Sequence, residues 1–457
     1  MTGTHTIAAL ATPPGMGAIA VVRLSGPEAI SIADAVFRSV RNKKLQKQSS
    51  HTVHLGHLYD DQTMVDEVLV TVFHGPHSYT GEDVVEISCH GSTYIQQKLL
   101  QIVMNKGAKM AEAGEFTLRA FLNGKMDLTQ AEAVADLIAS EGAAAHRMAI
   151  QQMRGGISDR LSGLRAQLVD FASLIELELD FSEEDVAFAD RTALEKLLDS
   201  IQETLKSLID SFALGNAMKN GVPVAIAGKP NAGKSSLLNA LFQEEKAIVS
   251  DIPGTTRDSI EDTLYLDGIQ FRFIDTAGLR ETDDKIEAIG VERAKDKIAQ
   301  SKLLLYVVDP TQTRAEEVNN AINELETENL QTLVIINKVD LLSNDDQDMY
   351  SNNLGKQTHL FISAQTQLGL KELKQQLSNL VQGETFETII SNNRHYATLK
   401  DALEATLAVR KGLSDGLSSD LLAIDLRATL DHLGTVTGTV STDELLGNIF
   451  ANFCIGK

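Results

Sequence analysis

Residues 228–235 read Gly-Lys-Pro-Asn-Ala-Gly-Lys-Ser, which is the pattern of a phosphate-binding loop. The glycines let the backbone curl until its N–H groups face an anion, and a helix that begins directly after the loop adds positive potential. Lys234 is then expected to reach the β- and γ-phosphates of a nucleotide, and the hydroxyl of Ser235 to bind Mg²⁺. The alternative is a chance glycine-rich turn, which the apolar run before the loop and the helical pattern after it disfavour. The expected phosphate contacts are Asn231, Ala232, Gly233, Lys234, Ser235 and Ser236.

A motif suited to recognising a base follows later in the chain. Residues 337–340 read Asn-Lys-Val-Asp and come directly after an apolar run. A carboxylate at the last position can accept hydrogen bonds from the ring N–H and the exocyclic amine of guanine, a pair that adenine does not offer. Leaving that carboxylate unmatched costs about 1–3 kcal/mol, so the motif favours GTP over ATP. The alternative is a solvated Asn-Lys turn. With the Ser-Ala pair after the next apolar run, the expected base contacts are Asn337, Lys338, Asp340, Ser363 and Ala364.

Two further motifs lie between the phosphate loop and the base motif. Residues 275–278 read Asp-Thr-Ala-Gly, in which the carboxylate can hold the magnesium shell and the glycine leaves its N–H free for the γ-phosphate. Residues 254–258 read Gly-Thr-Thr-Arg-Asp, and Thr256 is the candidate second Mg²⁺ ligand in a loop that senses the γ-phosphate. The expected contacts of the first motif are Asp275, Thr276, Ala277 and Gly278.

Leu279 stands where many GTPases place the glutamine that orients the attacking water, and its side chain cannot form hydrogen bonds. Another group must therefore act, and Arg257 remains a candidate for a built-in cation. Asn231 offers a side-chain carbonyl for a monovalent cation that neutralises charge between the phosphates, or else it braces its own loop. The residues alone leave both interpretations open. The nearby candidates for orienting water are Arg280, Glu281, Asp283, Asp284 and Glu287.

The elements that must position these motifs alternate between short apolar runs and helical stretches over residues 219–381. This alternation is typical of a parallel sheet with crossover helices, which predicts a Ras-like P-loop domain. The expected strands are Pro223–Ala227, Phe271–Ile274, Leu303–Val308, Leu333–Ile336 and Leu360–Ser363.

Helical periodicity flanks this region on both sides, at residues 121–218 and 382–457. We therefore expect one discontinuous helical domain with the nucleotide domain inserted in it, and an acidic break near residues 180–185. Before it, residues 1–120 contain short strands such as 18–24 and 68–73, which predict a small α+β domain. The fold class is thus multidomain α/β. The residues expected on one apolar helix face each are Leu161, Leu164, Leu168, Phe171, Leu174 and Ile175; Leu194, Leu197, Leu198, Ile201, Leu205, Leu208, Ile209 and Phe212; Leu399, Leu403 and Leu407; and Leu422, Leu426, Leu430 and Leu433.

Bulk composition limits the remaining possibilities. The 457 residues carry a formal net charge of −22, which opposes indiscriminate binding of polyanions. The two cysteines cannot form a disulfide framework, no apolar run reaches membrane-spanning length, and no signal segment opens the chain, so we expect no membrane and a cytoplasmic location. One basic run is expected to be a solvated loop, with a local nucleic-acid patch as the alternative: Arg38, Arg41, Lys43, Lys44 and Lys47.

Taken together, the motifs resemble the MnmE/TrmE family of tRNA modification GTPases from end to end. The phosphate loop alone is shared by many GTPases, whereas the terminal Phe-Cys-Ile-Gly-Lys and the inserted domain are more selective. The segments that carry the resemblance are residues 12–15, 79–83, 121–127, 228–235, 251–258, 275–281 and 453–457.

The resemblance implies a second ligand site and an assembly. The family binds a 5-formyl- or methylene-tetrahydrofolate as a one-carbon source in its N-terminal domain, through which it forms a homodimer. Matching the family pattern puts Arg23, Glu82, Lys125 and Lys457 near that folate. With the FAD-dependent partner MnmG, in a heterotetramer, the family adds an aminomethyl or carboxymethylaminomethyl group to the wobble uridine of tRNA. Cys454 matches a functionally important cysteine of the family.

The resemblance also implies how hydrolysis is stimulated. The G domains of the family pair when K⁺ is bound, and its magnesium ligands correspond to Ser235 and Thr256. Its water-positioning glutamate corresponds to Glu287. The K⁺ ligands correspond to Asn231, Ser250, Ile252 and Thr255, within a longer run of nucleotide contacts, Ser250, Asp251, Ile252, Pro253, Gly254, Thr255 and Thr256.

The sequence departs from the family at Ser250, where threonine is usual, and in the Cys89-His90 pair, for which packing at a strand end is the expected role. Two other functions use the same motifs. A GTPase switch in ribosome assembly needs the nucleotide site but no folate, and a folate-binding transferase could retain a relic nucleotide site. Without the resemblance, surface or packing roles would be expected for Arg23, Glu82, Lys125, Glu287 and Cys454.

Overall fold

The computed structural model describes residues 5–180, 190–243, 262–274, 298, 301–325, 330–382 and 389–456. The chain forms two compact units. Unit 1 comprises Met1–Ile138, Ile150–Leu205 and Ala397–Lys457. Unit 2 comprises Ala139–Ala149 and Lys206–Tyr396. Within the described part of the chain, none of the helices combines the length and the apolar character that crossing a bilayer requires.

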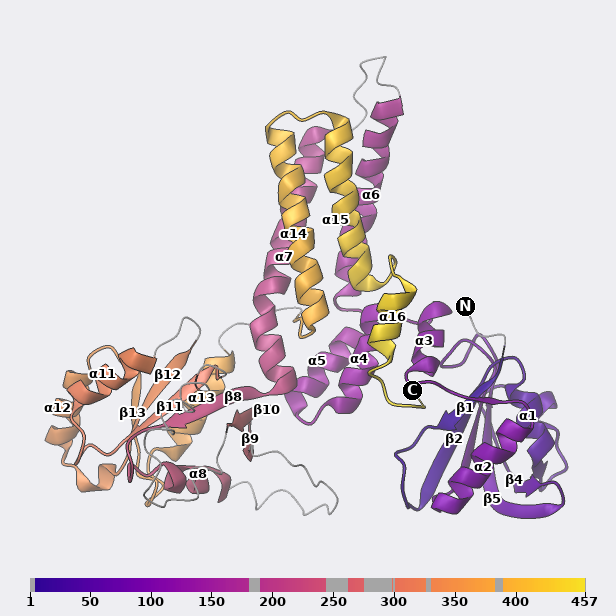
Figure 1. The fold of residues 1–457 in the computed structure, drawn as a ribbon, viewed down its shortest axis with the longest axis horizontal. Helices are drawn as coiled ribbons and strands as arrows, with labels where there is room; N and C mark the ends of the chain where they lie inside the picture. The colour runs from indigo at the N-terminus through magenta and orange to yellow at the C-terminus, as the bar shows by residue number, and fades with distance from the viewer. Residues whose placement is uncertain are drawn as a thin grey trace. The chain divides into compact units, whose positions relative to one another are not determined.

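A sheet forms the N-terminal part of unit 1 (Figure 1). It has seven strands in the order β3-β4-β5-β6-β2-β1-β7. The pairing of β1 with β7 is parallel, and the other pairings are antiparallel. The strands are β1 (Ile7–Leu10), β2 (Ile19–Ser25), β3 (Phe37–Ser39), β4 (Thr52–Asp60), β5 (Thr63–Phe73), β6 (Val84–His90) and β7 (Lys109–Met110).

Helices α1 (Ala29–Val36) and α2 (Thr93–Asn105) contribute to a core with one face of this sheet. Side chains alternate along β5, so that Val68, Val70 and Val72 are buried in that core. On the other face, the paired residues Leu55 and Leu69 are 44% and 46% exposed. This sheet therefore buries one face and leaves apolar side chains exposed on the other.

The strand predicted at 18–24 is shifted by one residue in β2, and the one predicted at 68–73 is the second half of β5. The first half of β5 was missed because its ladder with β4 continues through Asp66 and Glu67, where the apolar alternation stops. A β-bulge interrupts that ladder between Leu58 and Tyr59. A short 3₁₀ turn, η1 (Leu45–Lys47), follows the exposed loop after β3.

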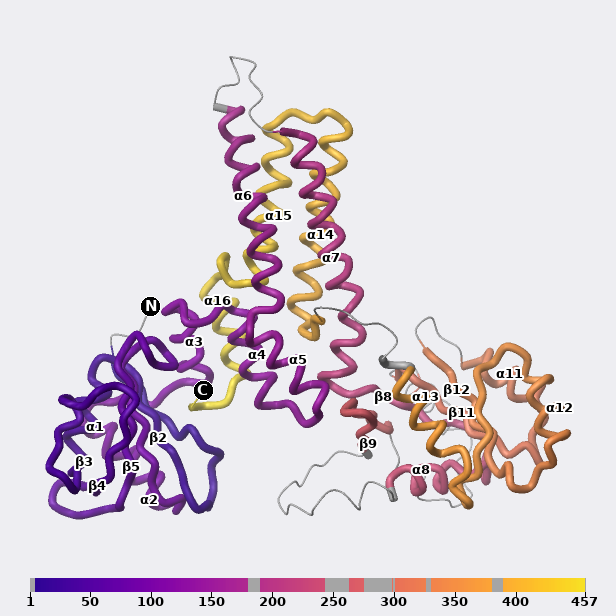
Figure 2. The backbone as a smooth tube through the Cα atoms, turned by 180° about the vertical axis from the view of Figure 1, so that it is seen from behind, coloured from indigo at the N-terminus to yellow at the C-terminus, as the bar shows by residue number. Residues whose placement is uncertain are grey.

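Helices make up the rest of unit 1, and two of them, α7 and α14, continue into unit 2. Helices α6 and α15 lie side by side (Figures 1 and 2), and α16 contacts α3. The helices are α3 (Glu115–Leu122), α4 (Leu128–Ala139), α6 (Ser158–Asp180), α7 (Arg191–Asn220), α14 (Asn393–Ser414), α15 (Ser419–Thr437) and α16 (Asp443–Phe450).

The apolar face predicted for α15 is confirmed, since the four predicted leucines, Leu422, Leu426, Leu430 and Leu433, are all buried. On α14 the prediction was wrong for Leu407, which is 44% exposed, and the buried face runs through Ala402, Thr406 and Val409 instead. A strict four-residue spacing drifts around a helix of 3.6 residues per turn, so the third leucine leaves the face. Leu174 of α6 is exposed, whereas its neighbour Ile175 is buried, because adjacent residues lie about 100° apart around a helix.

The C-terminal tail packs against the N-terminal sheet within unit 1. Ile455 forms an antiparallel bridge with Ala113, and the N–H of Gly114 donates to the carbonyl oxygen of Cys454 at 3.4 Å. A Cβ on Gly456 would lie 2.1 Å from the carbonyl oxygen of Leu10, so only glycine permits this approach. The tail thus lies beside the end of β1 that the short β7, paired only with Ile7 and Ala8, leaves uncovered.

Unit 2 contains a six-stranded sheet in the order β13-β12-β11-β8-β10-β9, in which only β9 is antiparallel to its neighbour. Helices α8 and α13 pack on one face, and α11 and α12 on the other. This is the doubly wound sheet that the alternating pattern predicted. The strands are β8 (Val222–Ala227), β9 (Asp262–Leu266), β10 (Ile269–Phe273), β11 (Leu303–Val308), β12 (Gln331–Ile336) and β13 (His359–Phe361).

The helices of unit 2 are α5 (Ala143–Met153, most of it), α8 (Lys234–Gln243), η3 (Val339–Leu341), α11 (Ala315–Leu325), α12 (Asn344–Leu354) and α13 (Leu370–Gln382). β11 has the predicted bounds, and the other four predicted strands, β8, β10, β12 and β13, each end within two residues of the predicted ends. Because β8, β11, β12 and β13 run parallel, their carboxyl ends meet at one edge of the sheet, where the nucleotide motifs follow.

Candidate functional site

The predicted phosphate loop connects β8 to α8, and α8 begins at Lys234. The Nζ atom of Lys234 donates to the carbonyl oxygens of Gly228 at 2.7 Å and Lys229 at 2.8 Å, so the side chain spans the start of the loop. Burial lowers the pKa of this ammonium group. Gly233 has φ +95°, and a Cβ there would lie 2.1 Å from Nδ2 of Asn337. The loop therefore accommodates no side chain at this position.

Asn337 connects the phosphate loop to the predicted base-binding segments. Its Nδ2 donates to the carbonyl oxygen of Ala232 at 2.9 Å, and its Oδ1 accepts from the N–H of Ala364 at 3.0 Å. The residue is 2% exposed. Three segments predicted separately from the sequence, at 231–236, 337–340 and 363–364, are thus brought together by one buried amide.

Within the base motif, Lys338 is partly buried, whereas Asp340 is exposed. Lys338 has φ +60° and forms an ion pair of 2.5 Å with Asp309, whose side chain is 4% exposed. Asp340 is the middle residue of η3 (Val339–Leu341). Its side chain is exposed and forms no hydrogen bond or ion pair with another described residue. Its carboxylate is therefore accessible to a ligand. Ser363 is fully buried, and its Oγ accepts from the N–H of Thr366 at 3.2 Å.

Asp309 was missed in the sequence, although it comes directly after the predicted strand Leu303–Val308. Burial raises the pKa of its carboxyl group, but hydrogen bonds from Lys338 and Thr311 outweigh burial, so that the pKa lies below its ordinary value. An acidic residue at the carboxyl end of a buried parallel strand was the signal that could have found it. Its role in the geometry is to orient the Lys338 side chain.

Several predicted residues lie outside the described residues. They are the run Ser250, Asp251, Ile252, Pro253, Gly254, Thr255 and Thr256, the motif Asp275, Thr276, Ala277 and Gly278, and also Arg257, Leu279, Arg280, Glu281, Asp283, Asp284, Glu287 and Lys457.

Of the predicted ligands for Mg²⁺ and K⁺, the described residues include Ser235 and Asn231, and both side chains offer an oxygen donor. Ser235 lies in the first turn of α8, and Ser236 beside it is exposed. Asn231 is exposed at the tip of the loop with φ +60°. Hydroxyl and amide oxygens suit hard cations, so the donor chemistry of both residues fits the predicted ions.

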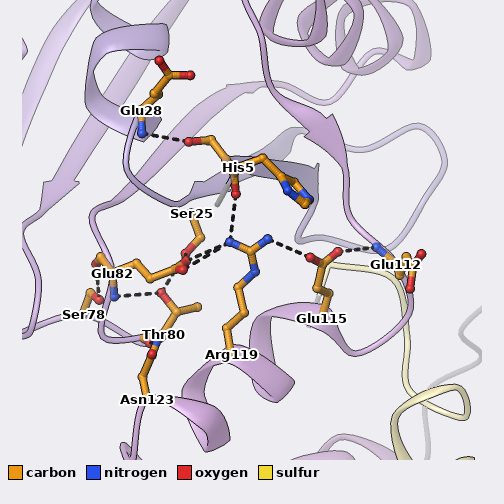
Figure 3. A network of polar contacts seen from close by, with 11 residues as sticks. His5, Ser25, Glu28, Ser78, Thr80, Glu82, Glu112, Glu115, Arg119 and Asn123 are labelled. Carbon is orange, nitrogen blue, oxygen red and sulfur yellow. Dashed lines mark hydrogen bonds and ion pairs between the residues drawn. The ribbon is translucent and has the colours of Figure 1, made fainter. Parts of the chain in front are cut away.

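A second cluster of predicted residues surrounds the loop Ser78–Asp83 in unit 1. Glu82 accepts from Oγ of Ser25 at 2.6 Å and from Nη1 of Arg119 at 3.2 Å to each carboxylate oxygen (Figure 3). The methylene chain of Lys125 lies near Gly81, where a Cβ would meet Cδ and Cγ at 3.4 Å, and its Nζ donates to the carbonyl oxygen of Pro76.

Arg23 reaches the same loop from β2. Its guanidinium lies over the ring of Tyr79, 5.3 Å from the centroid, and over Phe116 at 5.7 Å, while Nη2 pairs with Glu86 at 2.8 Å. Tyr79, Gly81 and Glu82 belong to one loop, so the structure brings Arg23, Glu82 and Lys125 together. Two cations, an accepting carboxylate and two aromatic rings are chemically suited to a flat heterocycle with an acidic tail.

Arg119 and Ser25 were not found in the sequence analysis. Arg119 is 37 positions from Glu82 and Ser25 is 57 positions from it, and neither belongs to a recognisable motif. Only the folded chain brings them to this carboxylate.

The two cysteines differ in environment. Cys454 is exposed in the C-terminal tail. Cys89 is buried in β6, where burial and then the charge of Asp66 raise the pKa of its thiol to about 11. The packing role predicted for Cys89 is confirmed, but that for His90 was wrong, because its exposed ring pairs with Asp66 at 2.7 Å. Cys89 is thus a protonated, packed thiol at neutral pH.

The five basic residues of the run in the N-terminal domain are all exposed, as expected for a solvated segment, although Leu45 within it is buried. Arg38 stacks on Tyr59 with its guanidinium carbon 3.9 Å from the ring centroid. Lys44 forms an ion pair of 3.5 Å with Asp34. These contacts account for part of the run without a nucleic-acid partner.

Comparison with known proteins adds the following. Residues 6–125 match the family model described as the N-terminus of the GTP-binding protein TrmE, and residues 128–454 match the model described as the MnmE helical domain. Proteins named tRNA modification GTPase MnmE are 55% identical in Flavobacterium johnsoniae, over 100% of both chains, and 54% identical in Flavobacterium psychrophilum, over 99% of both. The counterpart in Bacteroides fragilis is 50% identical over 99% of both chains. The similarity extends over both units and the tail.

Proposed function

The chain belongs to the MnmE family, and we propose that it is a GTP hydrolase that acts in the modification of tRNA. The observation that carries this proposal is the buried amide of Asn337, which joins the phosphate loop to the segments that would hold guanine. That arrangement serves a nucleotide bound across the edge of the sheet. Full-length similarity to proteins named for tRNA modification extends the proposal from the nucleotide to the process. It also disfavours the alternative of a ribosome-assembly switch.

In the proposed reaction, this chain's residues bind and orient the nucleotide. The backbone N–H groups of the loop and the ammonium of Lys234 neutralise the phosphates, and Asp340 accepts from guanine. Lys234 must exchange its present backbone acceptors, Gly228 and Lys229, for phosphate oxygens. Bound Mg²⁺, held by Ser235 and Thr256, would supply charge neutralisation between the phosphates. Glu287 would position water.

We further propose that K⁺ stimulates hydrolysis by joining two nucleotide domains, with ligands at Asn231, Ser250, Ile252 and Thr255. The exposed side chain of Asn231, at the tip of the loop, is consistent with a ligand rather than a brace. The test is GTP turnover in K⁺ and in Na⁺ at equal ionic strength. Equal rates in the two salts would contradict this part of the proposal.

The N-terminal cluster is proposed to bind 5-formyl- or methylene-tetrahydrofolate as the one-carbon source, through Arg23, Glu82, Lys125 and Lys457. The two cations suit the carboxylates of the folate tail, and Glu82 suits the N–H donors of its pterin ring. The exposed pair Leu55 and Leu69 supports dimerisation through this sheet, because such a patch is stabilised when a second copy covers it. The domains proposed to divide these tasks span residues 1–120, the helical 121–218 with 382–457, and the nucleotide-binding 219–381.

Cys454 is proposed to act in the modification step and not in GTP hydrolysis. Its exposure in a tail that packs on the N-terminal sheet supports a role near the folate rather than near the nucleotide. With the FAD-dependent partner MnmG, the chain would add an aminomethyl or carboxymethylaminomethyl group at C5 of the wobble uridine, in the cytoplasm.

The deciding experiment is mass spectrometry of tRNA nucleosides from cells that lack this gene. Wild-type complementation should restore the modified wobble uridine, whereas Lys234→Ala and Cys454→Ser should not. In vitro, Cys454→Ser should retain GTP turnover, and Lys234→Ala should lose it. Unchanged wobble uridine in the deletion strain would overturn the proposed function.

A further inference from the structure

Arg119 is a cation enclosed within unit 1. It lies on α3 and is 3% exposed. Its Nη1 donates to the carbonyl oxygen of His5 at 3.1 Å and to both carboxylate oxygens of Glu82, and its Nη2 donates to Oε1 of Glu115 at 2.8 Å (Figure 3). A guanidinium in this position is held on both sides, because its planar shape fixes the direction of every N–H.

The second carboxylate of the network holds Arg119 in place. Glu115 lies one turn before Arg119 on the same helix, and its other oxygen accepts from the N–H of Glu112 at 2.9 Å. Glu115 is therefore fixed to the backbone, and it fixes Nη2 in turn. As a result, Nη1 is directed at Glu82 rather than free to turn toward solvent.

Glu82 is held but not saturated. Its Oε2 accepts from Ser25 and from Arg119, whereas Oε1 accepts, among the described residues, from Arg119 alone. A carboxylate offers about four accepting positions, so one position at Oε1 remains. The side chain of Glu82 is 19% exposed, so part of it is open to a ligand. A pterin ring presents N–H groups that such an acceptor can bind.

The loop that bears Glu82 is held by further contacts that do not involve Arg119. Asn123 donates to the carbonyl oxygen of Thr80 at 2.7 Å, and Ser78 donates to the carbonyl oxygen of Glu82 at 2.5 Å. The backbone is thus held independently of the side chain. Removing Arg119 should therefore release the carboxylate without releasing the loop.

From this arrangement we propose that Arg119 is a positioning residue for folate binding, which holds the Glu82 carboxylate so that Oε1 accepts from the pterin. This inference rests on the proposed function of the N-terminal cluster. Arg119 does not touch the folate, and it acts only through Glu82. If Arg119 were only structural, Arg119→Met would weaken folate binding by the same factor whether position 82 is glutamate or glutamine.

The test is a double-mutant cycle on the full chain, with 5-formyl-tetrahydrofolate as the probe and calorimetry as the measurement. Glu82→Gln and Arg119→Met should each weaken binding by about 10-fold or more, on the scale of a lost charged hydrogen bond. The double variant should bind no more weakly than the weaker single variant, because the two residues act as one unit. Arg119→Lys, which keeps the charge but lacks the planar fork, should fall between wild type and Arg119→Met.

Arg427→Met is the control, since it removes a different guanidinium from a carboxylate in unit 1, Glu176, without strong destabilisation, and should leave folate affinity unchanged. Losses that multiply in the double variant, or wild-type affinity in Arg119→Met, would overturn the inference. If Arg119→Met folds poorly, Arg119→Lys decides, because wild-type affinity in that variant would exclude a need for the fork. Failure of the wild-type chain to bind the probe would instead remove the proposed folate site itself.

A second measurement needs no ligand. Hydrogen exchange of residues 78–83 in the ligand-free chain should be little changed by Arg119→Met, because the contacts from Asn123 and Ser78 remain. Strongly increased exchange of that segment would indicate that Arg119 supports the loop as a whole, and would overturn its assignment to the carboxylate.

Discussion

The side-chain amide of Asn337 donates to the carbonyl oxygen of Ala232, so the base motif and the phosphate loop share a hydrogen bond of 2.9 Å. Because Oδ1 also accepts from Ala364, both ends of one amide are occupied by backbone groups. Nucleotide recognition in unit 2 therefore depends on a residue that orders the site as well as on residues that contact the ligand.

Asn337→Ala should weaken GTP and XTP binding alike. The substitution removes hydrogen bonds that order the phosphate loop, and it leaves the group that selects the base, Asp340, unchanged. The loss of two buried hydrogen bonds corresponds to about 10- to 100-fold in affinity. Asp340→Asn should instead weaken GTP and strengthen XTP, since xanthine has a carbonyl where guanine has its exocyclic amine. Competition binding with both nucleotides separates the two variants, and a parallel change in both would contradict the role of Asp340.

Gly233→Ala should abolish nucleotide binding and destabilise unit 2. A methyl group there would lie 2.1 Å from Nδ2 of Asn337, on a backbone with φ +95° that side chains rarely adopt. Gly355→Ala is the control, because that residue also has positive φ but nothing within 4 Å of a Cβ. Thermal unfolding should show only the strain of about 1–3 kcal/mol in the control. Equal losses in the two variants would show that the contact with Asn337 does not matter.

Nucleotide affinity should fall as the pH rises, beginning below the ordinary lysine pKa of about 10.4. Burial lowers the pKa of Lys234 in the ligand-free chain, whereas bound phosphates favour the charged form. Binding must therefore take up a proton in the alkaline range, and affinity is lost as the proton becomes scarce. Calorimetry in buffers of different ionisation enthalpy detects this uptake. It should disappear in Lys234→Arg, whose side chain stays charged.

Asp309→Asn should lower the thermal stability of the chain at neutral pH by about 1–3 kcal/mol, because Lys338 loses its charged partner. The folded pKa of Asp309 is depressed, so its contribution is present above the unfolded pKa of about 3.9 and is lost as the pH falls through the folded pKa. The difference between wild type and variant should therefore shrink in acid. Asp348→Asn, on the exposed surface of α12, is the control and should change little.

Arg191→Met should destabilise the helical part of unit 1 far more than Arg427→Met. Arg191 pairs with Glu178, which is 6% exposed, and also donates to Ser419 at 3.0 Å. Removing it deprives a buried carboxylate of its charged partner, which costs about 3–5 kcal/mol. Arg427 and Glu176 are both exposed, and such pairs contribute about 0–1 kcal/mol. Denaturant unfolding of the two variants measures the difference, and similar midpoints would refute it.

The nucleotide site could be predicted from the sequence because its parts are local. A phosphate loop needs a strand, a tight turn and a helix in immediate succession, and residues 222–243 supply all three. The parallel sheet then brings the carboxyl ends of its strands together, so that motifs distant in sequence converge without further information. The fold class was confirmed for this reason.

The contacts that orient those residues could not be predicted, because each joins side chains that share no motif. The Arg119–Glu82 contact depends on where α3 lies against the loop after β5, and the His90–Asp66 pair depends on the register of neighbouring strands. The predicted helix face was correct on α15, where the last leucine follows after three residues, and wrong at Leu407, where the spacing is strictly four.

The packing of Gly456 beside Leu10 has a consequence for solubility. A strand end with unpaired N–H and C=O groups is a template on which another chain can add a strand, and the two-residue β7 protects only the first half of β1. The C-terminal tail occupies the space beside the second half. Proteolytic loss of these last residues would uncover that template. The clipped protein would be prone to self-association through β1 even if its free energy of unfolding were unchanged.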